Sequence, residues 1–297
     1  MDVVDVTIRA RPRPIGDFMV DRVLPSAVRR MVGPFAFLDH FGPLTLPSGA
    51  GMDVRPHPHI GLATVTVLFS GEILHRDSLG SRQVIREGAV NWMSAGRGIV
   101  HSERSTEGAR AAGPHMHGLQ IWVALPDAQE DDAPSFSHHA AESLPAFDDG
   151  GVRTKVLAGS AYGVTASVPV ASPQFLVDVH LEPGAAVPLP SDHDERAVYV
   201  VDGAVRCGGA AIEARTMAVV RPRVDAFVEA EEPAHVVLLG GASLGPRYVW
   251  WNFVSSTPDR IEEAARAWKE RRFPVVPGDE IEFVPLNDVP RLRPSAA

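Results

Sequence analysis

The sequence predicts an all-β protein of two tandem β-barrels followed by a short C-terminal helix. Short apolar runs separated by glycines recur between residues 64 and 103, about ten residues apart. The same alternation of short strands and turns is repeated after a stretch of acidic and small residues. Apolar residues with helical spacing follow near the C-terminus. We therefore expect a first barrel at residues 1–130, a linker at 131–150, and a second barrel with the helix at 151–297.

The first barrel is expected to start with strands at residues 3–9 and 35–40, each closed by nearby prolines or glycine. Further short strands with glycines between them are expected at 64–70, 72–78, 83–87, 89–94 and 99–103. Residues 118–125 supply a closing strand that ends before Pro126.

The second half begins after the linker, because the stretch from Pro126 to Gly151 is rich in acidic and small residues. Its strand candidates are VRTKVLAGS, QFLVDVHLEPG, RAVYVVDG, MAVVRP and HVVLLGG. A helix is expected at about 258–272, because Pro258 suits the first helical position and the residues spaced i, i+3, i+4 and i+7 are apolar. These residues are Ile261, Ala264, Ala265 and Trp268.

Composition excludes several classes of function. No apolar run approaches the roughly 18 residues of a membrane span, and the N-terminus lacks the apolar region of a secretory signal, so we expect a cytoplasmic protein without a membrane partner. The net charge of -9 argues against nucleic-acid binding. A single cysteine, Cys207, excludes an internal disulfide framework and thiolate-rich metal sites.

Two spaced pairs of polar residues indicate a metal site in the first barrel. His57 and His59 are two residues apart, and so are His101 and Glu103. Because side chains alternate faces along a strand, each pair points to one side and can present two donors to one point. Three imidazoles and one carboxylate suit a divalent first-row metal, and four protein ligands leave two positions open on a six-coordinate ion such as Fe(II).

Other histidine pairs fit a metal less well. They are His115 with His117, His138 with His139, and His193 with Glu195. The first has no acid in its own segment, the second places its rings on opposite sides of an extended chain, and the third has no second pair to complete it. We therefore predict one metal per chain, in the first barrel.

Two tandem barrels with HxH and HxE motifs in the first resemble a bicupin, a pair of cupin (jelly-roll type) barrels. The sequence is more specifically similar to one family, the pirin family, segment by segment. The segments that carry this resemblance are FAFLDHFGP, HPHIGLATVTVLFSGEILHRDSLG, GAVNWMSAGRGIVHSE and LQIWVALP. The resemblance is dense from residue 35 to 126 and looser in the second barrel.

The resemblance implies a single Fe(II), with ligands at His57, His59, His101 and Glu103. Other divalent metals are alternatives. It also implies an enzyme like quercetin 2,3-dioxygenase, which opens the central ring of a flavonol and releases carbon monoxide, so that the partner is a small aromatic substrate. Other family members are described as regulators that bind a protein partner and use iron as a redox sensor. A non-enzymatic redox-sensing protein is therefore the alternative.

The substrate-binding residues are expected to be His75, Trp92 and Met93, with Glu103 as the catalytic base. His75 could equally be a hydrogen-bonded strand histidine, and Trp92 and Met93 could be core residues. An isomerase acting on a polar substrate fits less well, because the expected walls are apolar. Ala63 departs from the glutamate that many family members carry there, so we expect Glu103 to serve as both ligand and base.

Overall fold

Strands dominate the computed structural model of the chain, which describes residues 2–15, 18–286 and 288. The predicted all-β class is confirmed. The chain divides into two compact units that are not consecutive in sequence. The first unit comprises residues 14–19, 41–138 and those from 244 onward, and the second comprises residues up to 13, 20–40 and 139–243.

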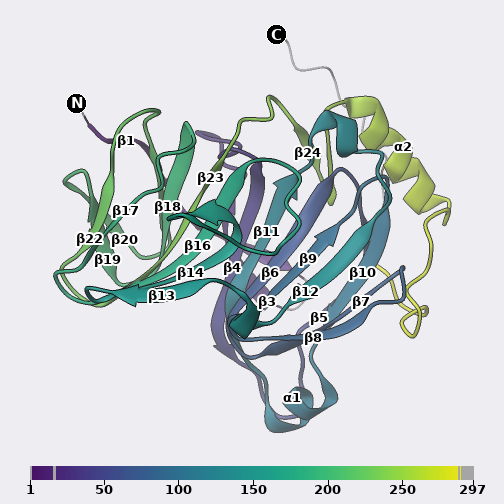
Figure 1. Cartoon of the computed structure of the whole chain (residues 1–297). Coiled ribbons are helices and arrows are strands. Elements are labelled where there is room, and N and C mark those ends of the chain that lie inside the picture. The colour runs from purple at the N-terminus through teal and green to yellow at the C-terminus, as the bar shows by residue number, and fades with distance from the viewer. Residues whose placement is uncertain (1, 16–17, 287, 289–297) are drawn as a thin grey trace. The chain divides into compact units, whose positions relative to one another are not determined.

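The first unit contains a four-stranded sheet in the order β5-β10-β7-β8 and a group of strands in the order β12-β9-β6-β11. The bounds of the first sheet are β5 Asp53–His59, β10 Ile99–Arg104, β7 Glu72–Asp77 and β8 Arg82–Arg86. Those of the second group are β12 Ser135–His139, β9 Val90–Ser94, β6 Leu62–Ser70 and β11 His115–Ala124. A short helix, α1 (Glu107–Ala112), lies at the end of this unit away from the C-terminal helix (Figure 1).

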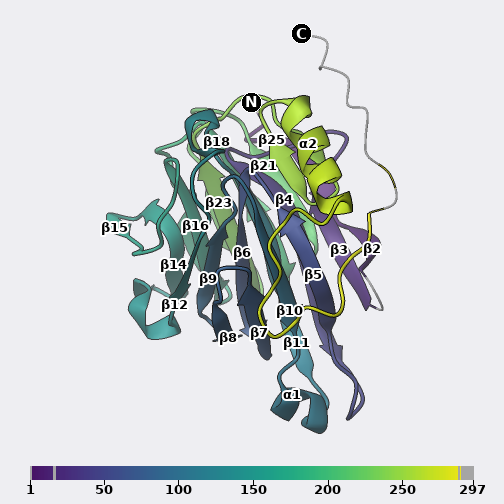
Figure 2. The same cartoon turned by 90° about the vertical axis from the view of Figure 1, so that its right-hand side faces the viewer.

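The C-terminal part of the first unit consists of a hairpin and a helix. A single-turn 3-10 helix, η1 (Asp127–Gln129), precedes β12, and the hairpin is formed by β24 (Tyr248–Trp250) and β25 (Phe253–Ser255). The helix α2 (Pro258–Lys269) buries the predicted apolar residues Ile261, Ala264, Ala265 and Trp268. It packs beside β25 (Figure 2), where Ile261 joins Ile60 and Phe253 in one apolar cluster. The helix predicted from its spacing therefore forms, although it ends slightly earlier than expected.

The second unit contains two further sheets. The larger has the order β1-β21-β18-β23-β16-β14-β13, with β15 beside β14, and the smaller has the order β17-β22-β19-β20. The larger sheet comprises β1 Val4–Arg9, β21 Thr216–Val220, β18 Glu195–Asp202, β23 Ala234–Gly241, β16 Gln174–Leu181, β14 Val152–Ala161, β13 Ala146–Asp149 and β15 Val164–Thr165. The smaller comprises β17 Ala186–Pro188, β22 Phe227–Ala230, β19 Ala204–Cys207 and β20 Ala210–Glu213.

Four strands have residues in both units: β2 (Arg11–Ile15), β3 (Phe18–Leu24), β4 (Phe35–Thr45) and, through its last residue, β12. The stretch expected to be a linker contains the end strands β12 and β13 and a 3-10 helix, η2 (Ala141–Ser143). The domain boundaries at residues 130 and 151 stay a prediction, and residues 289–297 lie outside the described part of the chain. Among the described residues, none of the helices has the length and apolar character needed to cross a membrane.

Candidate metal centre

Three neighbouring strands bring the predicted ligands to one face of a sheet. Strand β10 lies between β5 and β7, with His101 opposite both His57 and Asp77, and Glu103 opposite His75. Residues opposite one another in a sheet share a face, and so do residues two apart along a strand. The face therefore carries His57, His59, His75, His101 and Glu103 together.

Three of these side chains converge closely. The ring nitrogens that His57, His59 and His101 can offer to a metal lie within 4.8 Å of one another, and all three residues are buried. The Nε2 atoms of His59 and His101 are 3.1 Å apart. The Glu103 carboxyl comes from the same strand as His101 but is not part of this group of atoms within 4.8 Å of one another. We call His57, His59, His101 and Glu103 the first cluster.

Backbone carbonyls determine which nitrogen of two of these rings carries the proton. His57 Nδ1 lies 2.9 Å from the Arg55 carbonyl, and His59 Nδ1 lies 2.8 Å from the Asn252 carbonyl. A carbonyl only accepts, so each Nδ1 donates its proton and leaves a lone pair on Nε2. His101 Nδ1 is buried without a hydrogen-bond partner among the described residues. Two rings are thus fixed in the tautomer that ligates through Nε2.

Burial also keeps the three imidazoles uncharged. Loss of solvent lowers the pKa of His57 to about 4 and holds the pKa values of His59 and His101 well below their ordinary range. Metal ions bind the neutral imidazole, so no proton has to be displaced from these rings near neutral pH. Buried neutral imidazoles whose Nε2 atoms lie only 3.1 Å apart, as in His59 and His101, fit a shared cation.

Glu103 is a buried carboxyl whose protonation depends on its neighbours. Burial raises its pKa, against the charge of His75 and a hydrogen bond that Thr66 Oγ1 donates at 3.2 Å. The same hydroxyl lies 3.0 Å from the Gln120 side-chain oxygen, but it has only one proton to give. Turning the Gln120 amide so that its amino group faces Thr66 satisfies both contacts. The site therefore holds a carboxyl suited to proton transfer.

His75 is held in place beside Glu103. Its Nε2 donates to Asp77 Oδ2 at 3.0 Å, and Asp77 Oδ1 accepts two backbone N–H groups, from Leu79 at 2.9 Å and Ser81 at 3.0 Å. The His75 ring also stacks on Phe136, with centroids 4.3 Å apart. Sequence reasoning missed both partners. The spacing His-x-Asp could have suggested Asp77, whereas Phe136 lay in the expected linker.

The two predicted wall residues of β9 point to opposite faces. Met93 pairs with Thr64, which is also opposite Trp122, and the Trp122 ring contacts His59 at a centroid distance of 5.3 Å. Met93 thus shares the face that looks toward the first cluster. Trp92 pairs with Val65 on the opposite face, so the structure does not bring it to the cluster.

Ala63 also faces away from the cluster. It pairs with Ser94 and Val123, whereas Thr66, on the other face of β6, is the residue that contacts Glu103. The expectation that a glutamate at position 63 would supply a carboxylate to this site is corrected by the alternation of the strand. The absence of that glutamate removes no base from the cluster.

The C-terminal hairpin completes the surroundings of His59. Asn252, between β24 and β25, provides the carbonyl that accepts from His59, and the Val254 N–H donates to the Ile60 carbonyl at 3.2 Å. Gly61 adopts φ +66°, and a Cβ there would lie 2.0 Å from the Val254 carbonyl oxygen. Only glycine allows this close approach of the hairpin to the strand that carries the histidines.

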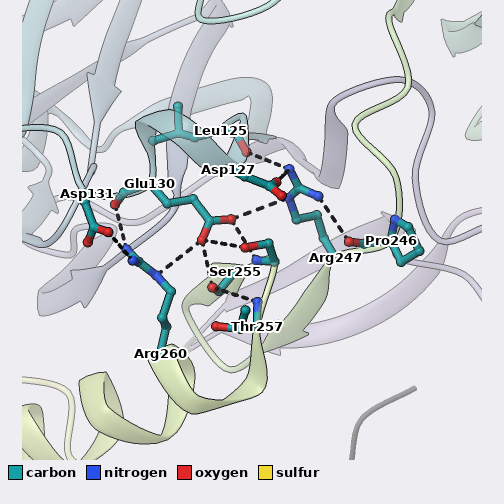
Figure 3. Close-up of polar contacts among 10 residues, drawn as sticks. Leu125, Asp127, Glu130, Asp131, Pro246, Arg247, Ser255, Thr257 and Arg260 are labelled. Carbon is teal, nitrogen blue, oxygen red and sulfur yellow. Dashed lines mark hydrogen bonds and ion pairs between the residues drawn. The ribbon is translucent and has the colours of Figure 1, made fainter. Parts of the chain in front are cut away.

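A buried polar network anchors both ends of this hairpin (Figure 3). At the end of its second strand, the Glu130 carboxylate accepts hydrogen bonds from Ser255 Oγ at 2.9 Å and from the Ser256 N–H at 2.7 Å. Before its first strand, Arg247 lies 3.6 Å from Glu130 and also donates to Asp127. Glu130 also forms an ion pair with Arg260 of α2 at 3.2 Å. Sequence reasoning did not identify this network, because Asp127 and Glu130 are more than a hundred residues away from their partners in the C-terminal segment.

The other histidine pairs have separate contacts. His115 Nδ1 bonds the Thr45 hydroxyl at 2.9 Å, and His138 Nδ1 bonds Asn91 at 2.7 Å. Glu195 accepts the Gly33 N–H at 2.8 Å, while the His193 ring stacks on Phe175. His193 and Glu195 thus make different contacts.

Two family models match the chain. The pirin family model matches residues 17–123, and the model of the pirin C-terminal cupin domain matches residues 176–274. A pirin-like protein of Caulobacter vibrioides is 49% identical over 289 residues, covering 96% of this chain and 100% of that protein.

Solved structures are similar over most of the chain. The crystal structure of a quercetin 2,3-dioxygenase from Acinetobacter baumannii is 34% identical, with a TM-score of 0.86 over 98% of this chain and 96% of that one. A bacterial pirin from Escherichia coli, in complex with nickel(II), is 18% identical, with a TM-score of 0.64 over 80% of this chain and 99% of that one. Its likeness concerns the fold, and together the matches support two cupin domains.

Proposed function

The chain belongs to the pirin family, and from this premise we propose that it is a metal-dependent dioxygenase acting on quercetin-like flavonols or a related aromatic. The observation that carries the proposal is the convergence of three neutral imidazoles beside a buried carboxyl. The similarity to a solved quercetin 2,3-dioxygenase over nearly the whole chain supports the choice of substrate.

We infer that the resident metal is Fe(II), held by His57, His59, His101 and Glu103. The residues fit such an ion because the lone pairs of His57 and His59 are directed by carbonyls and the donor set combines nitrogen with a carboxylate oxygen. When bound, the metal supplies a Lewis acid that lowers the pKa of a coordinated hydroxyl, and a redox-active centre.

The chain's own residues then have distinct tasks. Glu103, whose pKa is raised by burial, accepts the proton of the substrate hydroxyl. His75 is held by Asp77 and stacked on Phe136, so these residues offer a flat, partly apolar wall to an aromatic ring. Met93 shares the face toward the cluster, whereas Trp92 would act only by packing behind β9.

The test is metal analysis of the purified protein, followed by anaerobic addition of quercetin and then air. Loss of the visible absorbance of quercetin with release of carbon monoxide would support the enzyme. If the Fe(II)-loaded protein leaves quercetin and related flavonols unchanged, the dioxygenase proposal fails. The alternative, an iron-dependent redox-sensing protein that binds a partner, then takes its place.

Variants separate metal binding from proton transfer. The His59→Ala variant should lose the metal. The Glu103→Gln variant, compared with wild type at equal metal loading, should turn over about 10² to 10⁴ times more slowly, which is the usual contribution of a general base. His193→Ala is the control and should change neither, because its ring stacks on Phe175 in the second unit. Wild-type turnover by metal-loaded Glu103→Gln would exclude Glu103 as the base.

A further inference from the structure

The second unit contains its own convergent group of metal-binding side chains. Asp178 and His180 are two residues apart on β16, and His235 on the neighbouring strand β23 is directly opposite His180. All three side chains therefore lie on one face of the sheet. Their ligand atoms lie within 4.8 Å of one another. We call these residues the second cluster.

Both imidazoles of the second cluster turn toward the same carboxylate. His235 Nε2 donates to Asp178 Oδ1 at 2.5 Å, and His180 Nε2 lies 3.7 Å from Asp178 Oδ2. The two rings are stacked, with centroids 4.0 Å apart and planes 13° from parallel. Two Nε2 atoms and one carboxylate oxygen thus point to a common region. Divalent first-row metals accept such a donor set of two imidazoles and one carboxylate.

Solvent can reach this region. The side chain of His180 is 42% exposed, whereas those of Asp178 and His235 are 17% and 11% exposed. A pocket of about 290 Å³ is lined by both histidines. An ion could therefore enter from the His180 side and keep water as further ligands.

The charges around the pocket favour a cation. Its lining includes the carboxylates Asp148, Glu182 and Asp202 and a single guanidinium, Arg153. On the same face of the sheet, Arg153 is opposite His180 and Lys155 is opposite Asp178. With Asp178 included, the carboxylates outnumber these two cations. Arg153 and Lys155 nevertheless weaken the attraction, so the site should bind more weakly than one free of nearby positive charge.

We propose that Asp178, His180 and His235 form a second metal site, which takes a borderline-soft divalent cation such as Zn²⁺. For the ion to bind Nε2 of a neutral His235, the ring proton moves from Nε2 to Nδ1, and the lone pair freed on Nε2 is donated to the ion in place of the hydrogen bond to Asp178. The site lies on a different unit from the first cluster and does not depend on the proposed dioxygenase activity. It revises the expectation of one metal per chain, which considered only His193 and Glu195 in the second barrel.

The test is zinc titration of the metal-free full-length protein against a chromophoric chelator. Wild type should bind two ions, and a His57→Ala/His59→Ala variant should retain one. Adding His180→Ala to that variant should weaken the remaining site about tenfold or more, because one of three protein ligands is lost. Adding His193→Ala instead is the control and should leave it unchanged.

A second readout guards against misfolding and adventitious binding. Co²⁺ bound by the His57→Ala/His59→Ala variant should give a visible absorption spectrum that disappears on adding His180→Ala or Asp178→Asn, while circular dichroism remains that of a folded protein. The proposal is overturned if the folded His57→Ala/His59→Ala variant binds no ion. It is equally overturned if zinc binds His180→Ala and Asp178→Asn as tightly as their parent.

Discussion

Removing the carboxylate of Glu130 is expected to destabilise the first unit by about 3 kcal/mol. Glu130→Ala would leave the guanidinium of Arg247, whose side chain is only 3% exposed, without this partner, and would remove the acceptor of two serines. Breaking a buried ion pair by removing one partner typically costs about 3 to 5 kcal/mol. Arg247 keeps Asp127 and the Leu125 carbonyl as acceptors, so the lower end applies.

Urea unfolding followed by tryptophan fluorescence measures this loss, because Trp250 and Trp251 belong to the anchored hairpin. Glu130→Gln keeps an acceptor oxygen without the charge and should lie between Glu130→Ala and wild type. Asp131→Ala is the matched control: its side chain is 77% exposed and pairs with Arg260, so it should cost less than about 1 kcal/mol. Equal unfolding of Glu130→Ala and Asp131→Ala would refute the reasoning.

The same substitution should weaken metal binding at the first cluster. The hairpin that Glu130 anchors carries the Asn252 carbonyl, which fixes the tautomer of His59. Losing such a partner of a metal ligand typically lowers affinity about 10- to 100-fold. Wild-type affinity in a chelator competition with folded Glu130→Ala would mean that the hairpin holds His59 without this anchor.

Three further predictions concern the same unit. Gly61→Ala should lower the thermal midpoint more than Gly80→Ala: both glycines have positive φ, but only a Cβ at 61 meets the Val254 carbonyl, and scanning calorimetry compares them. Ala63→Glu should reduce the urea midpoint, because Ala63 is fully buried and the new carboxylate would have no partner there; a stable, more active variant would contradict this. Metal-free protein should lose stability as pH falls from about 6.5 toward 4. Over this range His57 becomes protonated in the unfolded chain but stays neutral in the folded protein, where its pKa is lowered to about 4. Urea midpoints across that range measure this loss, which for His57 alone is about 3 kcal/mol, and a midpoint independent of pH would contradict it.

The face that carries the first cluster could be anticipated because strand periodicity is a local property. Residues two apart share a face whatever the rest of the chain does, so His57 with His59 and His101 with Glu103 could be grouped from spacing alone. The structure brings the three histidines together. The apolar face of α2 followed from its spacing in the same way.

What could not be anticipated depends on register between distant segments. His235 becomes a neighbour of Asp178 and His180 only through the pairing of β16 with β23, and the Asp-x-His spacing alone gave no sign of a partner. Asn252 reaches His59 from 193 residues away through a main-chain carbonyl, which has no signature in the side-chain sequence. The opposite orientations of Met93 and Trp92 also required knowing which face of β9 looks toward the cluster.

The hairpin also sets an order for the assembly of the first cluster during synthesis. A nascent chain that has reached residue 243 already contains the three imidazoles and Glu103, but neither the Asn252 carbonyl nor the segment that Glu130 anchors. His59 in such a chain is free to adopt either tautomer and orientation. A metal can therefore be bound in its final geometry only after synthesis has passed residue 256. A shorter, ribosome-bound chain would bind the ion more weakly than the finished protein.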